Sequence, residues 1–274
     1  MYEMEEAGPS PTDISAKKEY IWQQKTRSLD AFNTILTALR ECCMKLHLGN
    51  KCDGQLNIPV THPNSEKHAL AGKHGGDNIK AIVSLLGDNV IQAEVVIKHP
   101  KGPGGTYRGV AQPDVQWKLQ QLQDLANHIV RATSVLCDVM KRLNQLNDEA
   151  FGIDSGELIL NAARMIKTEI SSARCSILLP RKRSLLELCY FPPTRKFAPP
   201  LPQDQLLSFY ISSCRLVCAS YQIVPKQNAN QGLSISLAEC ELPYLDDVIK
   251  QLNIAMSIIQ RLIGDLEMCK RRAI

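Results

Sequence analysis

A run of apolar residues at alternating spacings of three and four occupies the middle of the sequence. It follows Pro113 and Asp114, residues typical of a helix start. Such a seam forms one apolar stripe along a helix, and the stripe has to be buried against another apolar surface. The sequence therefore predicts a long helix that packs against other helices. The seam consists of Leu119, Leu122, Ala126, Ile129, Thr133, Leu136, Met140 and Leu143.

Three other segments have the same helical spacing. They lie before Gly49, between a turn at 151–155 and residue 176, and after Pro243. Because four stripes can bury one another, we expect an antiparallel four-helix bundle, and intermolecular pairing of the seams is the alternative. The predicted bundle domain comprises residues 14–48, 114–176 and 242–274.

Strand patterns fill the intervening segments. Residues 79–86 and 90–99 flank a Gly-Asp-Asn turn and predict an antiparallel hairpin, and residues 106–112 and 232–240 predict further strands. The proline-rich stretch from Ile177 mixes short strand-like pieces, since prolines exclude a continuous helix. For residues 205–224 we expect a helix, although the β-branched and aromatic content would also suit a strand.

The predicted fold class is thus α+β. A discontinuous antiparallel β-domain is expected from residues 55–112 and 177–241, inserted into the helical bundle, and residues 1–13 are expected to be a disordered N-terminus. Much of the segment from 50 to 78 is expected to be a loop.

The charge and cysteine content indicate a cytoplasmic protein. Lys and Arg number 32 against 28 acidic residues, an excess too small to predict a nucleic-acid partner. The acidic N-terminus does not resemble an export signal, so the 10 cysteines are expected to be free thiols. Charged residues interrupt every apolar stretch, and we expect no membrane span.

Motifs of enzymes are missing from the sequence. There is no phosphate loop, dinucleotide-binding glycine pattern, zinc-protease motif or nucleophile elbow, and the cysteines lack zinc spacing. We therefore expect no enzyme activity, no catalytic residue, no cofactor and no metal. Two alternatives remain open. His128 could pair with a cysteine in a cysteine-dependent hydrolase, or a basic cluster could make the chain a membrane-surface adaptor in vesicle traffic, through Arg181, Lys182, Arg183, Arg195 and Lys196.

Four segments resemble the Rogdi family in their residues, order and spacing. They are LLGDNVIQAEVVIKHP at 85–100, QWKLQQLQDLANHI at 116–129, KFAPPLPQDQLLSFYISSCRL at 196–216 and CELPYLDDVI at 240–249. The resemblance covers nearly the whole chain from about residue 15.

The resemblance implies a non-catalytic subunit with a helical bundle domain and a β-domain, similar to the small subunit of the fungal RAVE complex. It also implies association with rabconnectin-type β-propeller scaffold proteins and with soluble-sector subunits of the vacuolar-type proton pump, whose assembly the subunit promotes. Membrane association would then be peripheral, through those partners, on acidic organelles or vesicles such as synaptic vesicles. The family is described as leucine-zipper proteins, but Thr133 and Met140 stand in this seam, so no stable homo-oligomer is assumed.

Five residues are the candidate interdomain or partner contacts: Trp117, Phe197, Pro199, Arg195 and Lys196. Trp117 stands at a predicted helix start next to the β-domain, where it either joins the two domains or packs in a core. The proline-rich loop at 195–204 is either an exposed docking element that includes Phe197 or a simple connection between domains.

Overall fold

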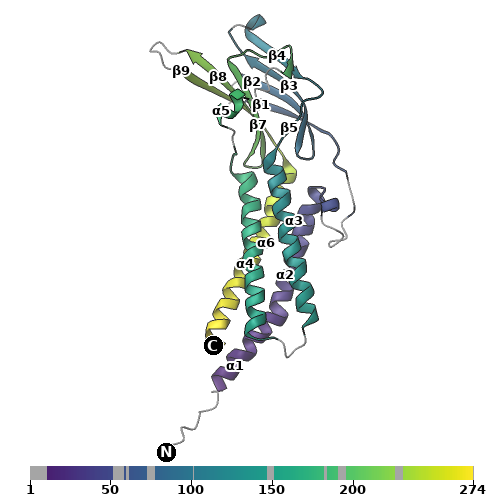
Figure 1. Ribbon diagram of the computed structural model, residues 1–274, viewed down its shortest axis with the longest axis vertical. Helices are drawn as coiled ribbons and strands as arrows, with labels where there is room; N and C mark the ends of the chain where they lie inside the picture. The colour runs from purple at the N-terminus through teal and green to yellow at the C-terminus, as the bar shows by residue number, and fades with distance from the viewer. Residues whose placement is uncertain are drawn as a thin grey trace, which may run out of the picture. The chain divides into compact units, whose positions relative to one another are not determined.

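The protein is an α+β structure (Figure 1). The computed structural model describes residues 11–51, 59, 62–72, 78–100, 102–146, 151–181, 184–190, 196–225 and 231–273. Its long helices are α1 (Pro11–Trp22), α2 (Ser28–Lys45), α3 (Gln120–Gln145), α4 (Ile153–Leu178) and α6 (Pro243–Ala273), and helix α5 (Leu185–Tyr190) is short. The π-helical turn η1 (Gln23–Arg27) joins α1 to α2, and the single turns η2 and η4 lie at Gly49–Lys51 and Pro103–Gly105.

Contacts along the chain define two compact units. The helical unit comprises Met1–Pro59, His128–Ser172 and Val248–Ile274, and the sheet unit comprises Val60–Asn127 and Ala173–Asp247. Each unit is described separately below.

The helical unit buries the apolar stripes that the sequence predicted. Ile35 and Leu39 of α2, Ile129 and Leu136 of α3, and Ile259 of α6 are all inaccessible to solvent. The predicted helices are therefore confirmed as helices, while their antiparallel four-helix arrangement stays a prediction.

The π-helical turn between α1 and α2 was not predicted. It turns Gln24 fully inward, where its side-chain nitrogen donates to the carbonyl oxygen of Gly152 at 3.0 Å. Its amide oxygen accepts a hydrogen bond from the hydroxyl of Ser155 at 2.7 Å, so the polar side chain has partners in the core. A Cβ on Gly156 of α4 would overlap the hydroxyl oxygen of Tyr20 of α1. The turn is thus fixed by buried polar contacts and close packing.

The sheet unit contains one antiparallel sheet of nine strands in the described residues. The strand order is β6-β4-β3-β2-β1-β9-β8-β7, with β5 paired to β3. The strands are β1 (Glu66–Gly72), β2 (Ile79–Leu86), β3 (Asn89–Lys98), β4 (Thr106–Ala111), β5 (Trp117–Lys118), β6 (Phe197–Ala198), β7 (Gln205–Ser212), β8 (Arg215–Pro225) and β9 (Gln231–Glu241).

Several predicted strands are confirmed. The hairpin β2–β3, strand β4 and strand β9 lie where the sequence patterns placed them. Strand β1 was expected to be a loop, and it connects the two halves of the sheet by pairing with both β2 and β9.

The predicted helix at 205–224 is wrong, because this segment is the hairpin β7–β8. Ser213 and Cys214 form its tight turn with positive φ angles of 48° and 61°. Leu206, Leu207 and Ile211 are buried although they lie on opposite faces of β7, so the strand lacks the alternation that identifies a half-exposed strand.

Two element boundaries also differ from the prediction. Helix α3 begins at Gln120, after strand β5, instead of at residue 114. The proline-rich stretch contains the short helix α5 where only strand-like pieces were expected. Prolines flank this helix in the sequence and are absent from its six residues, so they do not prevent it.

Candidate interaction surface

Trp117 lies in the core of the sheet unit, between the two ends of the sheet. Its side chain is 9% exposed, and its ring centroid lies 5.8 Å from that of Phe197 in β6 and 5.2 Å from that of Phe209 in β7. Strands β6 and β7 are the first and last of the sheet order, so the sheet curls until both ends meet one indole ring. Within this unit Trp117 therefore has the core-packing role that was one of its two predicted roles.

The segment after residue 195 lies against strand β4. Phe197 is 1% exposed, so it is not available as an exposed docking residue within this chain. A Cβ on Gly109 would come within 3.1 Å of the Leu201 side chain and 3.2 Å of the Pro199 carbonyl oxygen, which shows how closely the segment approaches the strand. Pro199 itself is exposed, after a cis peptide bond with Ala198.

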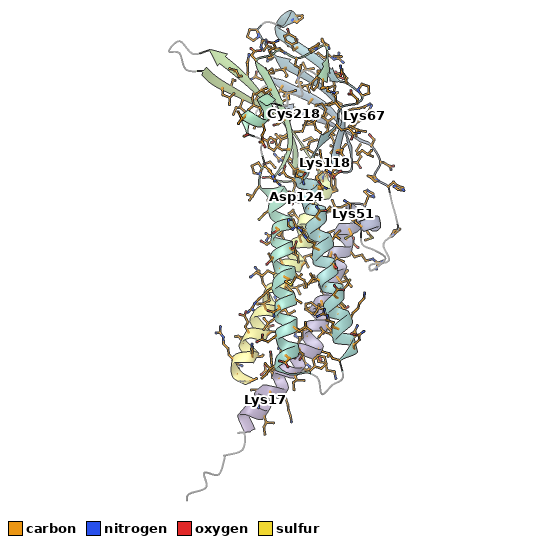
Figure 2. All side chains as sticks on the ribbon, viewed as in Figure 1. Lys17, Lys51, Lys67, Lys118, Asp124 and Cys218 are labelled. Atoms are coloured by element: carbon orange, nitrogen blue, oxygen red, sulfur yellow. The ribbon has the colours of Figure 1, made fainter. Side chains whose placement is uncertain are left out.

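The basic residues near this segment that the structure describes form ion pairs with carboxylates. Lys196 is exposed, and its ammonium lies 3.1 Å from the carboxylate of Asp114, where the hydrogen bond lowers the pKa of Asp114. Arg181 lies 2.6 Å from Asp124, whose place on α3 is marked in Figure 2. Arg195, Lys182 and Arg183 lie outside the described residues. The partner role of the five candidate residues and the basic cluster stays a prediction.

Gln121 is a buried polar residue that the sequence did not reveal. Its side-chain nitrogen lies 2.6 Å from the carbonyl oxygen of Ile211, 3.0 Å from that of Ser176 and 2.9 Å from that of Leu179, while its oxygen accepts from the backbone N–H of Ile211 at 2.8 Å. One side chain thus binds strand β7 and the last turn of α4. In the sequence, Gln121 is indistinguishable from Gln120 and Gln123, which lie on the polar side of the seam.

An exposed apolar row lies on strand β9. Leu233 is 42% and Ile235 is 53% exposed, and both point to the same face of the sheet because they are two residues apart. Farther along this face, Leu237 packs against the buried cluster of Leu188, Leu206, Tyr210, Val217, Ala219 and Tyr221. The short helix α5 supplies Leu188 to that cluster while exposing Leu186.

We name Leu233 and Ile235 the β9 row. It continues the apolar face of a buried cluster to the protein surface, where it is a candidate protein-binding surface. In the sequence, serines alternate with Leu233, Ile235 and Leu237, but a strand pattern does not reveal which apolar positions remain uncovered.

His128 and three of the buried cysteines lie in surroundings that do not favour a catalytic Cys–His pair. The Nδ1 of His128 lies 2.7 Å from a carboxylate oxygen of Glu169, which also accepts from Arg131 at 3.1 Å. Burial raises the pKa of Cys42 to about 12 and that of Cys214 to about 11, and it also raises the pKa of Cys218. A raised pKa keeps a thiol protonated at neutral pH and makes it a poor nucleophile.

Two further classes of site are absent from the described part of the chain. It contains no group of three or more His, Cys, Asp or Glu residues arranged to hold a metal ion. None of its helices is both long enough and apolar enough to cross a bilayer.

The sequence resembles known proteins over most of its length. The family model described as "Rogdi leucine zipper containing protein" matches residues 19–261. The Caenorhabditis elegans protein rogdi homolog is 55% identical over 276 residues, which cover 97% of this chain and 94% of that protein. The Drosophila melanogaster protein rogdi is 32% identical over 68% of this chain and 66% of its own length. The Homo sapiens protein rogdi homolog is 26% identical over 73% of this chain and 76% of its own length. This chain therefore belongs to the Rogdi family.

Proposed function

We propose that this protein is a non-catalytic binding subunit of a RAVE/rabconnectin-type complex that promotes assembly of the vacuolar-type proton pump and so organelle acidification. The observation that carries a binding role is the β9 row, where 42% of Leu233 and 53% of Ile235 remain exposed beside a buried apolar cluster. The choice of partner rests on membership of the Rogdi family, which is not a known enzyme family.

In this proposal the β9 row contacts a β-propeller scaffold protein. Burial of two large aliphatic side chains supplies apolar contact area, and the serines that alternate with them leave the opposite face of β9 polar. The helices of the helical unit form an antiparallel four-helix bundle that meets soluble-sector subunits of the pump. The subunit contributes interface area instead of chemistry, and the scaffold holds it at the organelle membrane from the cytoplasmic side.

Pump reassembly in cells that lack this protein tests the proposal. After the soluble and membrane sectors have been separated, reassembly should be slower in the knockout than in cells that carry the wild-type gene, and vesicle pH should be higher. Normal reassembly together with normal vesicle pH in a clean knockout would contradict the assembly role.

The hydrolase alternative has its own test in the same cells. We expect His128→Ala to restore reassembly as fully as the wild-type gene, because the imidazole lies beside Glu169 and Arg131 and burial raises the pKa of the Cys42 and Cys218 thiols. Loss of function in a His128→Ala protein that still folds would favour a catalytic histidine.

A further inference from the structure

Strand β9 has an open edge. On one side it pairs over its full length with β8. On the other side, the described residues of β1 pair only with Ala238 and Glu239. From Gly232 to Leu237, this side of β9 therefore has no strand beside it in the described part of the chain. The hairpin of β8 and β9 can be followed in Figure 1.

One hydrogen bond identifies the residues of β9 whose backbone faces the open edge. The N–H of Leu242 donates to the carbonyl oxygen of Cys214 at 3.2 Å. In an antiparallel ladder, residues that bond to the neighbouring strand alternate with residues that point away from it. Because the register with β8 continues without a shift, the odd-numbered residues of β9 point their N–H and C=O groups away from β8. Glu239 is one of them, and it pairs with Ala71 of β1 on that side. The odd-numbered residues at the open edge are Leu233, Ile235 and Leu237.

The open edge lacks the features that usually prevent an edge strand from pairing. These features are charged side chains, prolines, bulges and short length. From Gly232 to Ala238 the sequence GLSISLA contains no charged residue and no proline, and the register with β8 contains no bulge. By contrast, Gln121 bonds to the edge of β7, and β6 ends after 2 residues at Pro199. The chain thus protects both terminal strands of the sheet order and leaves the edge of β9 able to pair.

The open edge and the β9 row are formed by the same residues. Leu233 and Ile235 point their backbone groups to the edge, and their side chains are exposed on one face of the strand. Ser234, between them, is exposed on the opposite face. A strand added here would gain backbone hydrogen bonds, and its apolar side chains on one face would pack beside Leu233 and Ile235.

We propose that the edge of β9 from Gly232 to Leu237 binds an extended segment of a partner protein by strand addition. The segment has apolar residues at alternate positions, on the face of the β9 row. Main-chain hydrogen bonds to Leu233 and Ile235 contribute affinity, and the alternating side chains contribute specificity. The inference rests on the proposed function, because it assigns the segment to the scaffold protein, and it adds the geometry of that contact.

A segment of a larger partner fits this edge better than a second copy of the chain does. A specific dimer interface buries about 1,200–2,000 Å² in total. The open edge is short, and its large exposed side chains are Leu233 and Ile235, which are each only about half exposed. Two copies joined only here would bury too little surface for a stable dimer. A scaffold protein can add further contacts outside this strand.

Hydrogen exchange of individual backbone amides tests the pairing. The complex is purified from cells through the tagged full chain, and its residue-resolved exchange is compared with that of the purified chain alone. Strand addition should slow exchange about tenfold or more at Leu233, Ile235 and Leu237, whose N–H groups point to the open edge. The amides of Ser234 and Ser236 face β8 and should exchange slowly in both samples. Docking of the side chains without a strand would not produce this alternation.

Proline and serine variants separate the backbone from the side chain. Ile235→Ser removes the apolar side chain and keeps the N–H, whereas Ile235→Pro removes both and directs its ring at the open edge. We expect Ile235→Pro to recover about tenfold less scaffold than Ile235→Ser. Ser234→Pro is the matched control for the fold. It removes an N–H that faces β8, so it should lower the unfolding temperature more than Ile235→Pro does.

Four outcomes would count against the inference. Recovery of the scaffold without slower exchange at the three outward amides would overturn strand addition and leave the proposed function standing. Equal recovery by folded Ile235→Ser and Ile235→Pro proteins would do the same. Slow exchange at these amides in the purified chain alone, together with the mass of a dimer, would assign the edge to a second copy and overturn the partner segment. Recovery of the wild type without any scaffold would overturn the proposed function and this inference with it.

Discussion

The side-chain amide of Gln121 exchanges two hydrogen bonds with the backbone of Ile211, as a peptide group of a neighbouring strand would. The nitrogen donates to the Ile211 carbonyl oxygen at 2.6 Å and the oxygen accepts from its N–H at 2.8 Å. Strand β7 is the last strand of the sheet order, so Gln121 occupies hydrogen-bonding positions on its outer edge. A single side chain of α3 thereby makes the hydrogen bonds that a further strand would make at this edge.

Replacing Gln121 by Leu should destabilise the protein by about 2–4 kcal/mol, because the buried backbone groups of Ile211 and the carbonyl oxygens of Ser176 and Leu179 lose their partner. Urea unfolding measures this loss. Gln120→Leu is the matched control, since Gln120 is exposed and its side-chain amide donates to the exposed side of the helix at Asp124, and it should change stability by less than about 0.5 kcal/mol. Equal stability of the two variants would show that the Gln121 contacts contribute little.

Two helical glycines should respond to alanine in opposite ways. In Gly156→Ala the new methyl group would overlap the Tyr20 hydroxyl and lie 2.9 Å from the Gln24 side-chain nitrogen, so we expect a loss of about 1–3 kcal/mol. Gly264 has nothing within 4 Å of the new Cβ, and Gly264→Ala should stabilise α6 by up to about 1 kcal/mol. Thermal unfolding distinguishes the two.

Adding Tyr20→Phe to Gly156→Ala removes the oxygen atom nearest to the new methyl group. The double variant should therefore recover part of the lost stability. A Gly156→Ala protein more stable than the wild type would contradict the close approach of α1 to α4.

Trp117→Ala should be among the most destabilising substitutions in the sheet unit, with a loss of about 3–5 kcal/mol. The indole contacts Phe197 and Phe209, which lie in the strands at the two ends of the sheet order, so its removal leaves a cavity where the curled sheet closes. Trp117→Phe keeps an aromatic ring and should cost less. Chemical unfolding of both variants measures which of them loses more stability. A Trp117→Ala protein about as stable as the wild type would exclude the core role.

Stability should fall at alkaline pH. Burial raises the pKa of Cys42 from 9.0 to about 12, that of Cys214 from 9.0 to about 11 and that of Tyr210 from 10.0 to about 12. The folded protein holds these protons to higher pH than the unfolded chain does, so ionisation favours unfolding as the pH rises from 9 towards 12.

Urea midpoints measured from pH 8 upwards test this dependence. The midpoint should decrease above pH 9, and Cys42→Ala should make the decrease shallower because one of the shifted groups is gone. A midpoint that rises or stays constant between pH 9 and pH 11 would contradict the burial of these groups.

The sequence predicted those parts of the fold in which one face of an element is buried. The stripe through Ile129 and Leu136, the hairpin β2–β3 and the alternation in β9 were all recognisable because a regular spacing separates buried from exposed positions. The prediction of a helix at strand β7 was wrong because both faces of the strand are buried, so its sequence lacks the alternation of apolar and polar residues.

The candidate sites depended on features that spacing does not encode. Phe197 and Trp117 were recognised as important aromatic residues, but their mutual contact joins strands far apart in the sequence. Gln121 and Gln24 are buried polar residues whose partners come from distant segments, so each resembles an ordinary surface glutamine in the sequence. The exposure of Leu233 and Ile235 depends on what the folded chain leaves uncovered.

The most direct test of the proposed binding role is affinity purification of the tagged protein from its own cells in mild salt, followed by quantitative mass spectrometry. Three proteins are compared: the wild type, a β9-row variant carrying Leu233→Ser and Ile235→Ser, and the control Val110→Ser, at an exposed position of β4. We expect the wild type and the control to recover β-propeller scaffold proteins with soluble-sector pump subunits, and the β9-row variant to recover much less of the scaffold. Recovery of the wild-type protein alone, without scaffold or pump subunits, would contradict the proposed binding role.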